Sequence, residues 1–432
     1  MFRKISKELL KWKESKYRKP LLLQGARQTG KTYSVMEFAR MQYDNTAYVN
    51  FEFDKDASAI FAESLDPRAI IPKIEVFTRQ TITKGRTLIF FDEIQLCPAA
   101  LTSLKYFEEF ASDYHVVTAG SLLGVAVGRG EFSFPVGKVN RLTLYPMDFE
   151  EYLIAAVGSF EFSERIKECF DNNTPMDSYY HSMLLEQYRK YLVVGGMPEC
   201  VSKFLDTNDY IFVKTVQKLI LEDYLDDMSK YNTKSEIQKT RLTYNSITAQ
   251  LSKKNTKFQY KLVKRGGRAS ELENAVEWLV LSGIAIRVYG IDTVKKPLEN
   301  YKNIDSFKIF MSDAGLLCAK NNVAHNDVLY NSAEILDFKG GMTENYVCCQ
   351  LIGSGHICYT WQSGGEAEID FVIQREGALI PIEVKSAENR KAKSLKIYMQ
   401  RYKPGYAIKI SADNFGFENG VKTIPLYAAF CI

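Results

Sequence analysis

The sequence predicts an α/β protein of several domains, whose first part is a parallel sheet covered by helices. The chain has 432 residues, which corresponds to about three domains at roughly 150 residues each. Over residues 1–150, short apolar or β-branched runs alternate with amphipathic segments. The runs predict strands at 21–24, 47–53, 87–91 and 116–119, and the amphipathic segments predict helices at 33–41 and 100–110. Such alternation is typical of parallel strands with helices on both faces.

Composition excludes several classes of protein. Hydrophobic residues make up 46% and charged residues 25%, which is ordinary for a globular chain and excludes disordered and fibrous ones. The longest apolar stretches, such as 278–286, are far shorter than the ~20 residues of a spanning helix, so we expect no membrane insertion. The basic N-terminus lacks the apolar core of a secretory signal, and none of the eight cysteines forms a C-x-x-C pair. We therefore expect reduced thiols and a cytoplasmic location.

The distribution of charge points to a partner, although the net charge of +4 does not. Residues 385–403 carry seven basic side chains against one acid, Glu388. Residues 253–268 carry seven and no acid, namely Lys253, Lys254, Lys257, Lys261, Lys264, Arg265 and Arg268. Such clusters are either solvated faces or nucleic-acid contacts, and two in one chain favour DNA. We expect 253–268 to form a DNA-contacting helix and wing; docking onto an acidic surface of another domain or protomer is the alternative.

A phosphate-binding loop follows the first predicted strand and precedes a predicted helix. It fits the pattern G-x-x-x-x-G-K-[ST] with the residues Gly25, Ala26, Arg27, Gln28, Thr29, Gly30, Lys31 and Thr32. Glycines let successive backbone N–H groups face phosphate oxygens, and the helix N-terminus favours negative charge. We expect Lys31 to lie between the β- and γ-phosphates of ATP and the Thr32 hydroxyl to ligate Mg²⁺.

Two acids follow the predicted strand 87–91. Asp92 and Glu93 stand at its carboxyl end, where ligands bind in open α/β sheets. We expect Asp92 to hold Mg²⁺ through its water shell. Glu93 is expected to orient or deprotonate the attacking water, which is the role that separates a hydrolase from a nucleotide binder.

Residues after the strand 116–119 are weaker candidates for the same site. Ser121 is expected to contact the γ-phosphate or the water, with an ordinary helix cap as the alternative. Arg129 and Arg141 are candidate arginine fingers, with a surface role as the alternative.

The rest of the chain is expected to form three parts. Residues 149–230 predict helices, and in the loop 195–199 Pro198 suits the first turn of a helix. Residues 236–300 predict two helices, a basic helix and a short strand pair at 284–289, an order that suggests a winged helix. A linker is expected at 303–306, followed by strands at 307–311, 369–374 and 379–385. The predicted domains are the nucleotide-binding core at 1–150, a helical lid at 151–235, a winged helix at 236–302 and a C-terminal domain at 303–432.

These motifs resemble the AAA-like P-loop ATPases of bacteria and archaea over nearly the whole chain. The resemblance is carried by residues 19–28 (KPLLLQGARQ), 92–95 (DEIQ), 118–121 (TAGS), 144–152 (LYPMDFEEY) and 195–199 (GGMPE). It implies a helical lid, a winged-helix segment and a C-terminal domain of restriction-endonuclease type.

The nuclease type of site has an acid, then an Asp, then Glu-x-Lys. The corresponding residues are Glu344 on a helical segment, Asp370 at the start of a strand, and Glu383 and Lys385 at the end of the next. Alternation along a strand puts Glu383 and Lys385 on one face. Asp370 and Glu383 could then bind Mg²⁺ while Lys385 lowers the pKa of the nucleophilic water. The usual proline before the Asp is Ile369 here, and whether the site cuts stays open.

A group of cysteines invites a metal interpretation that the spacing does not support. Cys348, Cys349, His356 and Cys358 match no standard zinc pattern, and Cys348 fits an apolar helix face. We expect these residues to pack in the core.

The combined interpretation is a cytoplasmic Mg²⁺–ATP-binding ATPase whose cycle controls a DNA-directed nuclease-like module. One alternative is a nucleotide-gated signalling or scaffold protein with an inactive nuclease-like domain. Another is an enzyme whose main activity is nuclease chemistry. Assembly of several copies is a further expectation, and no membrane partner is expected.

Overall fold

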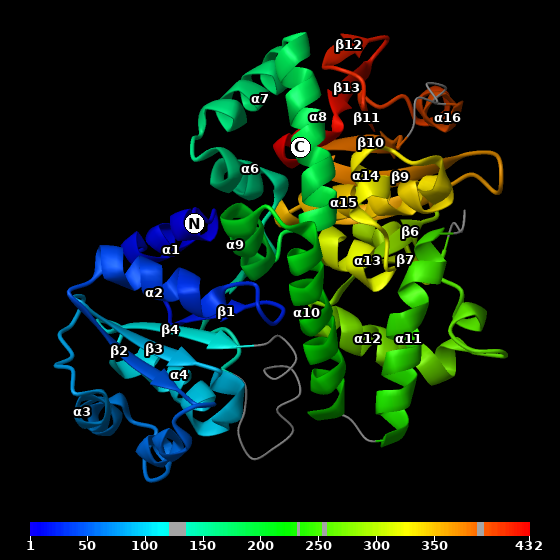
Figure 1. Cartoon of the computed structure of the whole chain (residues 1–432). Coiled ribbons are helices and arrows are strands. Elements are labelled where there is room, and N and C mark those ends of the chain that lie inside the picture. The colour runs from blue at the N-terminus through cyan, green and yellow to red at the C-terminus, as the bar shows by residue number, and fades with distance from the viewer. Residues whose placement is uncertain (121–134, 231–233, 253–256, 387–392) are drawn as a thin grey trace. The chain divides into compact units, whose positions relative to one another are not determined.

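The computed structural model describes residues 1–120, 135–230, 234–252, 257–386 and 393–432. The chain divides into two compact units (Figure 1). The N-terminal unit comprises residues 1–145 and 281–283, and the C-terminal unit comprises residues 146–280 and 284–432. No helix among the described residues is long and apolar enough to cross a membrane.

The N-terminal unit is built on a parallel sheet with the strand order β2-β3-β4-β1-β5. The strands are β1 (Leu21–Gln24), β2 (Asn45–Asn50), β3 (Thr87–Asp92), β4 (His115–Gly120) and β5 (Asn140–Thr143). The helices are α1 (Ile5–Glu14), α2 (Lys31–Gln42), α3 (Pro67–Thr78) and α4 (Pro98–Phe110), with short 3₁₀ turns η1 (Lys55–Phe61) and η2 (Ile94–Leu96). The four strands and two helices expected from the apolar runs are all confirmed, each within two residues at most ends.

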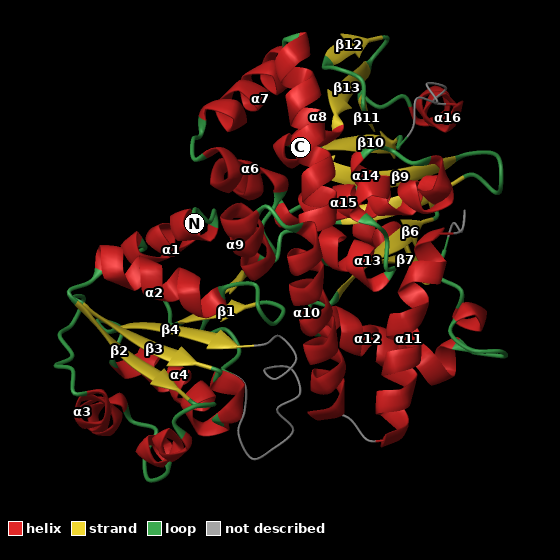
Figure 2. Ribbon diagram, viewed as in Figure 1, coloured by secondary structure: helices red, strands yellow, loops and turns green. Residues whose placement is uncertain are grey.

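Alternation along the strands gives this sheet two apolar faces. On one face Leu21, Leu23 and Phe90 pack with residues of α1 and α2, and on the other Leu22 and Phe91 pack with residues of α3 and α4. Figure 2 shows these two helix pairs on opposite sides of the sheet. Burial of each such Leu or Phe stabilises the fold by about 1.5–3 kcal/mol. The two cores therefore fix the positions of the strands relative to one another. The carboxyl ends of β1, β3 and β4 therefore lie along one edge.

Helices make up the first part of the C-terminal unit. They are α6 (Phe149–Val157), α7 (Glu161–Asn172), α8 (Ser178–Val194), α9 (Pro198–Thr207), α10 (Tyr210–Lys230), α11 (Lys234–Ser252) and α12 (Ala269–Leu281), with the turn η3 (Tyr260–Leu262). Asp148 and Glu151 form a capping box at the start of α6, so the motif at 144–152 is a helix-start signal. Pro198 occupies the first turn of α9, as expected.

A mixed sheet with the order β12-β13-β11-β10-β9-β8-β6-β7 forms the rest of this unit. Its strands are β6 (Ala285–Ile291), β7 (Lys302–Met311), β8 (Cys358–Gln362), β9 (Glu368–Arg375), β10 (Ala378–Val384), β11 (Ala407–Ser411), β12 (Gly416–Glu418) and β13 (Val421–Pro425). The other helices are α13 (Ala314–Lys320), α14 (His325–Leu329), α15 (Leu336–Gly353) and α16 (Lys393–Tyr402), with turns η4 (Leu298–Tyr301), η5 (Ala333–Ile335) and η6 (Leu426–Cys431). Cys348 and Cys358 are buried in its core.

The expected linker at 303–306 is wrong, because these residues belong to β7. β7 pairs antiparallel with β6, and β6 pairs parallel with β8, so residues on both sides of the expected boundary at 302 share one sheet. The strand pair expected at 284–289 is likewise a single strand whose partner comes later in the chain. β7 stands at the edge of the sheet, where one side pairs with no other strand of the described residues. Edge strands tolerate the polar residues that suggested a linker.

The expected basic helix is also wrong in its described part. Residues 257–268 contain the 3₁₀ turn η3, and the next helix, α12, begins only at Ala269. Gly266 has a positive φ of 73° and Gly267 N–H bonds back to Lys264 O at 3.0 Å. A glycine in the left-handed region ends helical geometry.

Candidate functional site

The phosphate-binding loop connects β1 to α2 in the N-terminal unit. Gly30 precedes α2 with φ 87°, a conformation that few other residues adopt. A Cβ at Gly25 would lie 2.3 Å from Leu144 O, so a side chain there would collide with the backbone beyond β5. Both glycines of the pattern are therefore required by the path of the chain.

Backbone carbonyls of the loop hold the lysine. Lys31 Nζ donates to Ala26 O at 2.8 Å and to Gly25 O at 3.1 Å. Neutral carbonyls satisfy the ammonium protons without cancelling its charge. The group thus stays a cation inside the loop, as phosphate binding requires.

Arg3 braces the same loop and was not expected from the sequence. Its side chain is buried, with Nη1 donating to Thr29 O at 2.9 Å and Nη2 donating to Tyr145 O at 2.7 Å. No motif marks Arg3, since it lies just before α1 and more than twenty positions before the loop. Only the packing of α1 against the sheet brings it there.

Thr32 and Asp92 meet, as the sequence predicts. Thr32 Oγ1 donates to Asp92 Oδ2 at 2.7 Å, and Tyr48 OH donates to the same oxygen at 3.0 Å. Burial raises the pKa of Tyr48 to about 12, so its hydroxyl stays a donor. A hydroxyl and a carboxylate oxygen side by side are hard ligands of the kind that Mg²⁺ prefers, and these residues fit that ion.

Glu93 has a neighbour that the motif did not identify. Glu93 adopts φ 51°, and its carboxylate accepts a short hydrogen bond from Gln95 Nε2. Burial raises the pKa of Glu93, which makes its carboxylate a stronger base. Gln95 Oε1 is buried and has no hydrogen-bond partner among the described residues. It lies against the tip of β4, 2.5 Å from where a Cβ of Gly120 would be. Gln95 stands within the 92–95 motif, so its place there was the available signal.

The structure says less about the three remaining candidates of the N-terminal site. Ser121 and Arg129 lie outside the described residues. Arg141 lies on β5 with an exposed side chain, paired in register with Leu22 of β1. Its role as an arginine finger stays a prediction.

The candidate nuclease residues of the C-terminal unit lie on α15, β9 and β10. β9 and β10 pair antiparallel with Phe371 opposite Ile382, so the next step of the register brings Asp370 opposite Glu383. Asp370 Oδ2 accepts a hydrogen bond from Val384 N at 2.7 Å. Glu383 pairs with Lys385 at 2.5 Å, while its Oε2 is buried and has no hydrogen-bond partner in the described part of the chain.

A lysine from β7, which the sequence reasoning missed, joins these acids. Lys308 Nζ is 2.7 Å from Glu344 Oε1 and 2.8 Å from Glu368 Oε1. Burial alone would lower the pKa of Lys308, but the carboxylates of Glu344, Glu368 and Asp370 outweigh it and raise that pKa. Lys308 is therefore a buried cation among acids. Lys308 lies in the strand expected at 307–311, but no spacing pattern links it to Glu344 or Glu368.

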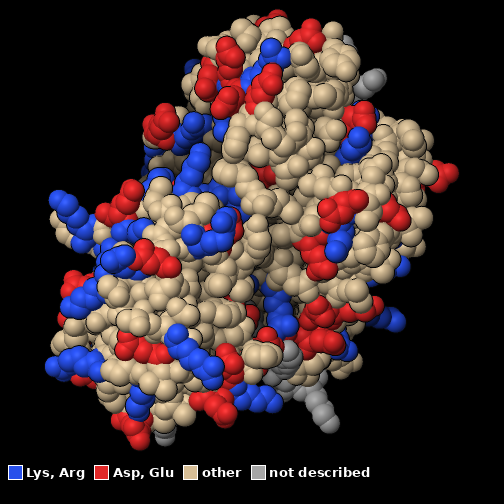
Figure 3. All heavy atoms as spheres, turned by 60° about the vertical axis from the view of Figure 1, so that its left-hand side comes forward, with Lys and Arg blue, Asp and Glu red and all other residues tan. Residues whose placement is uncertain are grey.

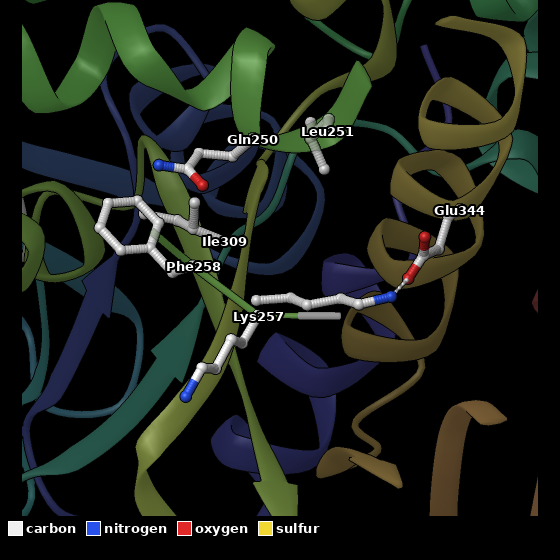
Figure 4. A pocket seen from close by; sticks show the side chains of 7 residues that line it. Gln250, Leu251, Lys257, Phe258, Ile309 and Glu344 are labelled. Atoms are coloured by element: carbon white, nitrogen blue, oxygen red, sulfur yellow. Dashed lines mark hydrogen bonds and ion pairs between the residues drawn. The ribbon is translucent and has the colours of Figure 1, made fainter. Parts of the chain in front are cut away.

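Burial also changes the acids. Burial, helped by the nearby Glu344, raises the pKa of Asp370 to about 7, although Lys308 opposes the shift. A cavity of about 20 Å³ beside this cluster is lined by Gln250, Leu251, Lys257, Phe258, Lys308, Ile309 and Glu344 (Figure 4). That volume holds about one water molecule.

A divalent metal does not fit this cluster as it stands. Among the described residues, no three or more acidic, histidine or cysteine side chains are arranged to hold a metal ion. Lys308 instead pairs with Glu344, one of the candidate nuclease acids, and with the nearby Glu368. Ammonium groups and divalent cations compete for the same carboxylate oxygens.

Positive charge on the basic stretch is partly neutralised. Lys264 forms a short ion pair with Glu271 of α12, and the other described basic residues of the stretch are Lys257, Lys261, Arg265 and Arg268. On the face shown in Figure 3, basic and acidic side chains are interspersed.

Three segments of the chain match known families. Residues 17–153 match an AAA domain, residues 185–327 a domain of unknown function (DUF8612), and residues 339–429 another domain of unknown function (DUF4143). No curated protein matches the chain.

Several solved structures are similar at low identity. The Walker-type ATPase PABY2304 of Pyrococcus abyssi is 14% identical, covering 74% of this chain and 95% of its own, with a TM-score of 0.42. The Aeropyrum pernix ORC1 protein in complex with DNA is 13% identical, covering 74% and 91%, with a TM-score of 0.29. The Thermotoga maritima RuvB Holliday junction branch migration motor is 14% identical, covering 67% and 90%, with a TM-score of 0.29. The AAA match coincides with the sheet and the loop described above, so this part of the chain is similar to an AAA domain with a P-loop ATPase-like core.

Proposed function

We propose that the chain binds Mg²⁺–ATP through residues 25–32 and hydrolyses it with Glu93 as the base. The observation that carries this proposal is the hydrogen bond of 2.7 Å between Thr32 and Asp92, next to a lysine held inside the loop. Lys31 and the loop N–H groups hold the phosphates, and Thr32 and Asp92 hold Mg²⁺. When bound, Mg²⁺ neutralises part of the phosphate charge.

Glu93 takes the proton of the attacking water in this proposal. Its raised pKa strengthens it as a base, and the hydrogen bond from Gln95 restrains the carboxylate. Ser121 is proposed to contact the γ-phosphate or the water, but it lies outside the described residues.

The test is the steady-state rate of ATP hydrolysis, measured with and without duplex DNA. We expect Mg²⁺-dependent turnover that Glu93→Gln abolishes while nucleotide binding persists. Turnover that survives in Glu93→Gln would move the base to another residue. No turnover under any condition, with tight ATP retention, would favour a switch over a hydrolase.

We further propose that the nucleotide cycle controls a DNA-directed C-terminal unit. Support comes from the basic residues at 257–268. It also comes from the order helix α15, strands β8, β9 and β10, helix α16, strand β11, in which Asp370 accepts a hydrogen bond from the backbone of Val384, the residue between Glu383 and Lys385. Each phosphate contact changes the log–log salt slope of binding by about −0.9. Replacing Lys261 and Arg265 with Ala should therefore flatten the slope by about 1.8 if both touch phosphates. An unaltered slope would retire the DNA contact of this segment.

A second candidate is a nucleotide-gated scaffold whose nuclease-like domain does not cut. The ion pair of Lys308 with Glu344 favours it, because it occupies an acid of the candidate nuclease site. The two candidates are separated by incubating plasmid DNA with the protein and Mg²⁺ or Mn²⁺. Cleavage that Lys385→Ala abolishes would reject the scaffold; its absence in the wild type would support the scaffold.

A further inference from the structure

A second cavity in the C-terminal unit lies between α8, α15 and the loops that follow β10 and β11. Its volume is about 130 Å³, close to that of an engineered cavity of about 150 Å³ that binds benzene. Much of its wall is apolar, with Leu185, Leu192, Val328, Ile335, Met342 and Leu426. It therefore has room for a body the size of a single ring.

The polar part of the wall includes two cations. Arg189 and Lys339 line the cavity, and no acid is among the lining residues that the structure describes. The Nε–H of Arg189 is buried and donates to no acceptor among the described residues. An unsatisfied buried donor costs about 1–3 kcal/mol, and more when it is charged, so such a group calls for a partner. Guanidinium groups match the planar oxygens of carboxylates and phosphates.

Rigid packing defines one side of the cavity. The ring of Tyr188 packs edge-on against Tyr346 with centroids 4.9 Å apart, on the helix turn that carries Arg189. A preformed apolar wall with a few fixed polar groups is the usual character of a small-molecule site.

We propose that this cavity binds a small organic oxyanion, with a ring-sized apolar body between α8 and α15 and a carboxylate or phosphate on Arg189. Two lining residues, Thr343 and Ser386, directly adjoin Glu344 and Lys385 in the chain. An occupant therefore touches the segments that carry the C-terminal carboxylate site. Binding here does not require ATP hydrolysis by the N-terminal unit.

The experiment titrates the full-length protein with benzoate, phenyl phosphate, inorganic phosphate and the neutral benzyl alcohol. The measurements are thermal shift and NMR of ¹³C-methyl-methionine, which reports Met342 inside the cavity. We expect saturable stabilisation and a shifted Met342 signal with benzoate or phenyl phosphate, and at least tenfold weaker binding of benzyl alcohol. A stronger response to benzoate would identify a carboxylate ligand, and a stronger response to phenyl phosphate a phosphate ligand.

Variants tie the response to the site. Arg189→Gln should weaken oxyanion binding by about 10- to 100-fold, the range for a hydrogen bond to a charged group. Arg165→Gln is the matched control, because that guanidinium lies over the Tyr180 ring at 4.7 Å and does not line the cavity. Ala412→Trp, at an exposed lining position, should block binding without removing a charge.

Several results would overturn the proposal. These are no saturable response to either aromatic anion, an equal response to benzyl alcohol, or binding that Arg189→Gln leaves unchanged. A response to inorganic phosphate alone that survives Ala412→Trp would place the anion elsewhere. If Arg189→Gln does not fold, Arg189→Lys serves instead, since it keeps the charge and removes the Nε–H, and full affinity there would equally reject the site.

Discussion

The two units each bring a lysine to a group of acids, but with opposite results. In the N-terminal unit, Lys31 is held by backbone carbonyls, and Asp92 bonds to the neutral hydroxyls of Thr32 and Tyr48. In the C-terminal unit, Lys308 pairs directly with Glu344 and Glu368. The first arrangement keeps cation and anion apart, as the proposed binding of phosphates and Mg²⁺ requires. The second neutralises them against each other.

The difference teaches how a motif relates to a site. The phosphate-binding loop is a local structure, in which spacing alone determines which atoms meet. The C-terminal acids are spread over α15, β9 and β10, and their partner comes from β7, so a distant strand decides what charge they carry. The predictions below test this contrast, from the largest expected effect to the smallest.

Glu93→Gln should have the largest effect. Removing a general base lowers turnover by about 10²–10⁴-fold, while nucleotide affinity stays nearly unchanged because the phosphate loop is intact. The measurements are ATP turnover and nucleotide Kd, with Glu63→Gln, an exposed acid paired with Lys73, as the control. Equal loss of binding and turnover would show that Glu93 holds the nucleotide and does not serve as the base.

Lys308→Met should destabilise the C-terminal unit by about 3–5 kcal/mol, the cost of leaving buried charges unpaired. Chemical denaturation measures this, and the exposed Lys295→Met is the control. The loss should shrink at acidic pH, where the acids become neutral. A loss of stability below about 1 kcal/mol would mean that Lys308 contributes no more than an exposed ion pair does, which would contradict its description as a buried cation among acids.

Asp313 is a buried carboxylate that backbone N–H groups stabilise. In the described contacts, no lysine forms an ion pair with it. It accepts hydrogen bonds from Gly196 N at 2.6 Å and Leu316 N at 2.7 Å, and burial raises its pKa to about 6. Because the folded state binds this proton more tightly than the unfolded state, the contribution is present at acidic pH and is lost as pH rises through about 6. We expect a decline of about 3 kcal/mol between about pH 4 and 7.

Asp313→Asn should remove that decline, at the cost of one hydrogen bond. Denaturation midpoints from pH 4 to 7 measure it, and the exposed Asp305→Asn is the control. Asp370 contributes a slope of the same sign, since its pKa is raised to about 7, so the variant is compared with the wild type at each pH. If the difference in unfolding free energy between Asp313→Asn and the wild type were the same at every pH from 4 to 7, the decline would not come from Asp313.

Lys31→Ala should abolish most of the stabilisation by Mg²⁺–ATP. A ligand at a hundred times its Kd stabilises the folded state by about 2.7 kcal/mol, and the phosphates lose their nearest cation in this variant. Thermal shift with and without nucleotide measures it, and the exposed Lys105→Ala on α4 is the control. A thermal shift equal to that of the wild type would reject the loop as the nucleotide site.

Gln95→Leu should have the smallest effect, about tenfold in turnover, or ~1.4 kcal/mol. The Gln95 amide lowers the pKa of Glu93 against the larger effect of burial, so its loss should move the acidic limb of the pH–rate profile to higher pH. Gln80→Leu, at a distant hydrogen bond to Asn45, is the control. A lower rate with an unmoved limb would mean that Gln95 only supports the fold.

The sequence by itself determined the N-terminal sheet and its loop. Continuous apolar runs need burial on two faces. The glycine pattern of residues 25–32 leaves the chain few other paths, so Lys31, Thr32 and Asp92 could be identified together. Gln95 and Arg3 needed the structure, since contacts across a turn or a helix leave no spacing pattern.

Only the tertiary structure decided the character of the C-terminal unit. The polar start of β7 resembles a linker in sequence, because an edge strand has a free side that water can cover. Its pairing with β6 then extends one sheet across the expected boundary and brings Lys308 to Glu344 and Glu368. Acids on three elements and a lysine on a fourth meet only after long-range pairing. A local pattern therefore predicted where these acids lie, and the fold determined their partner.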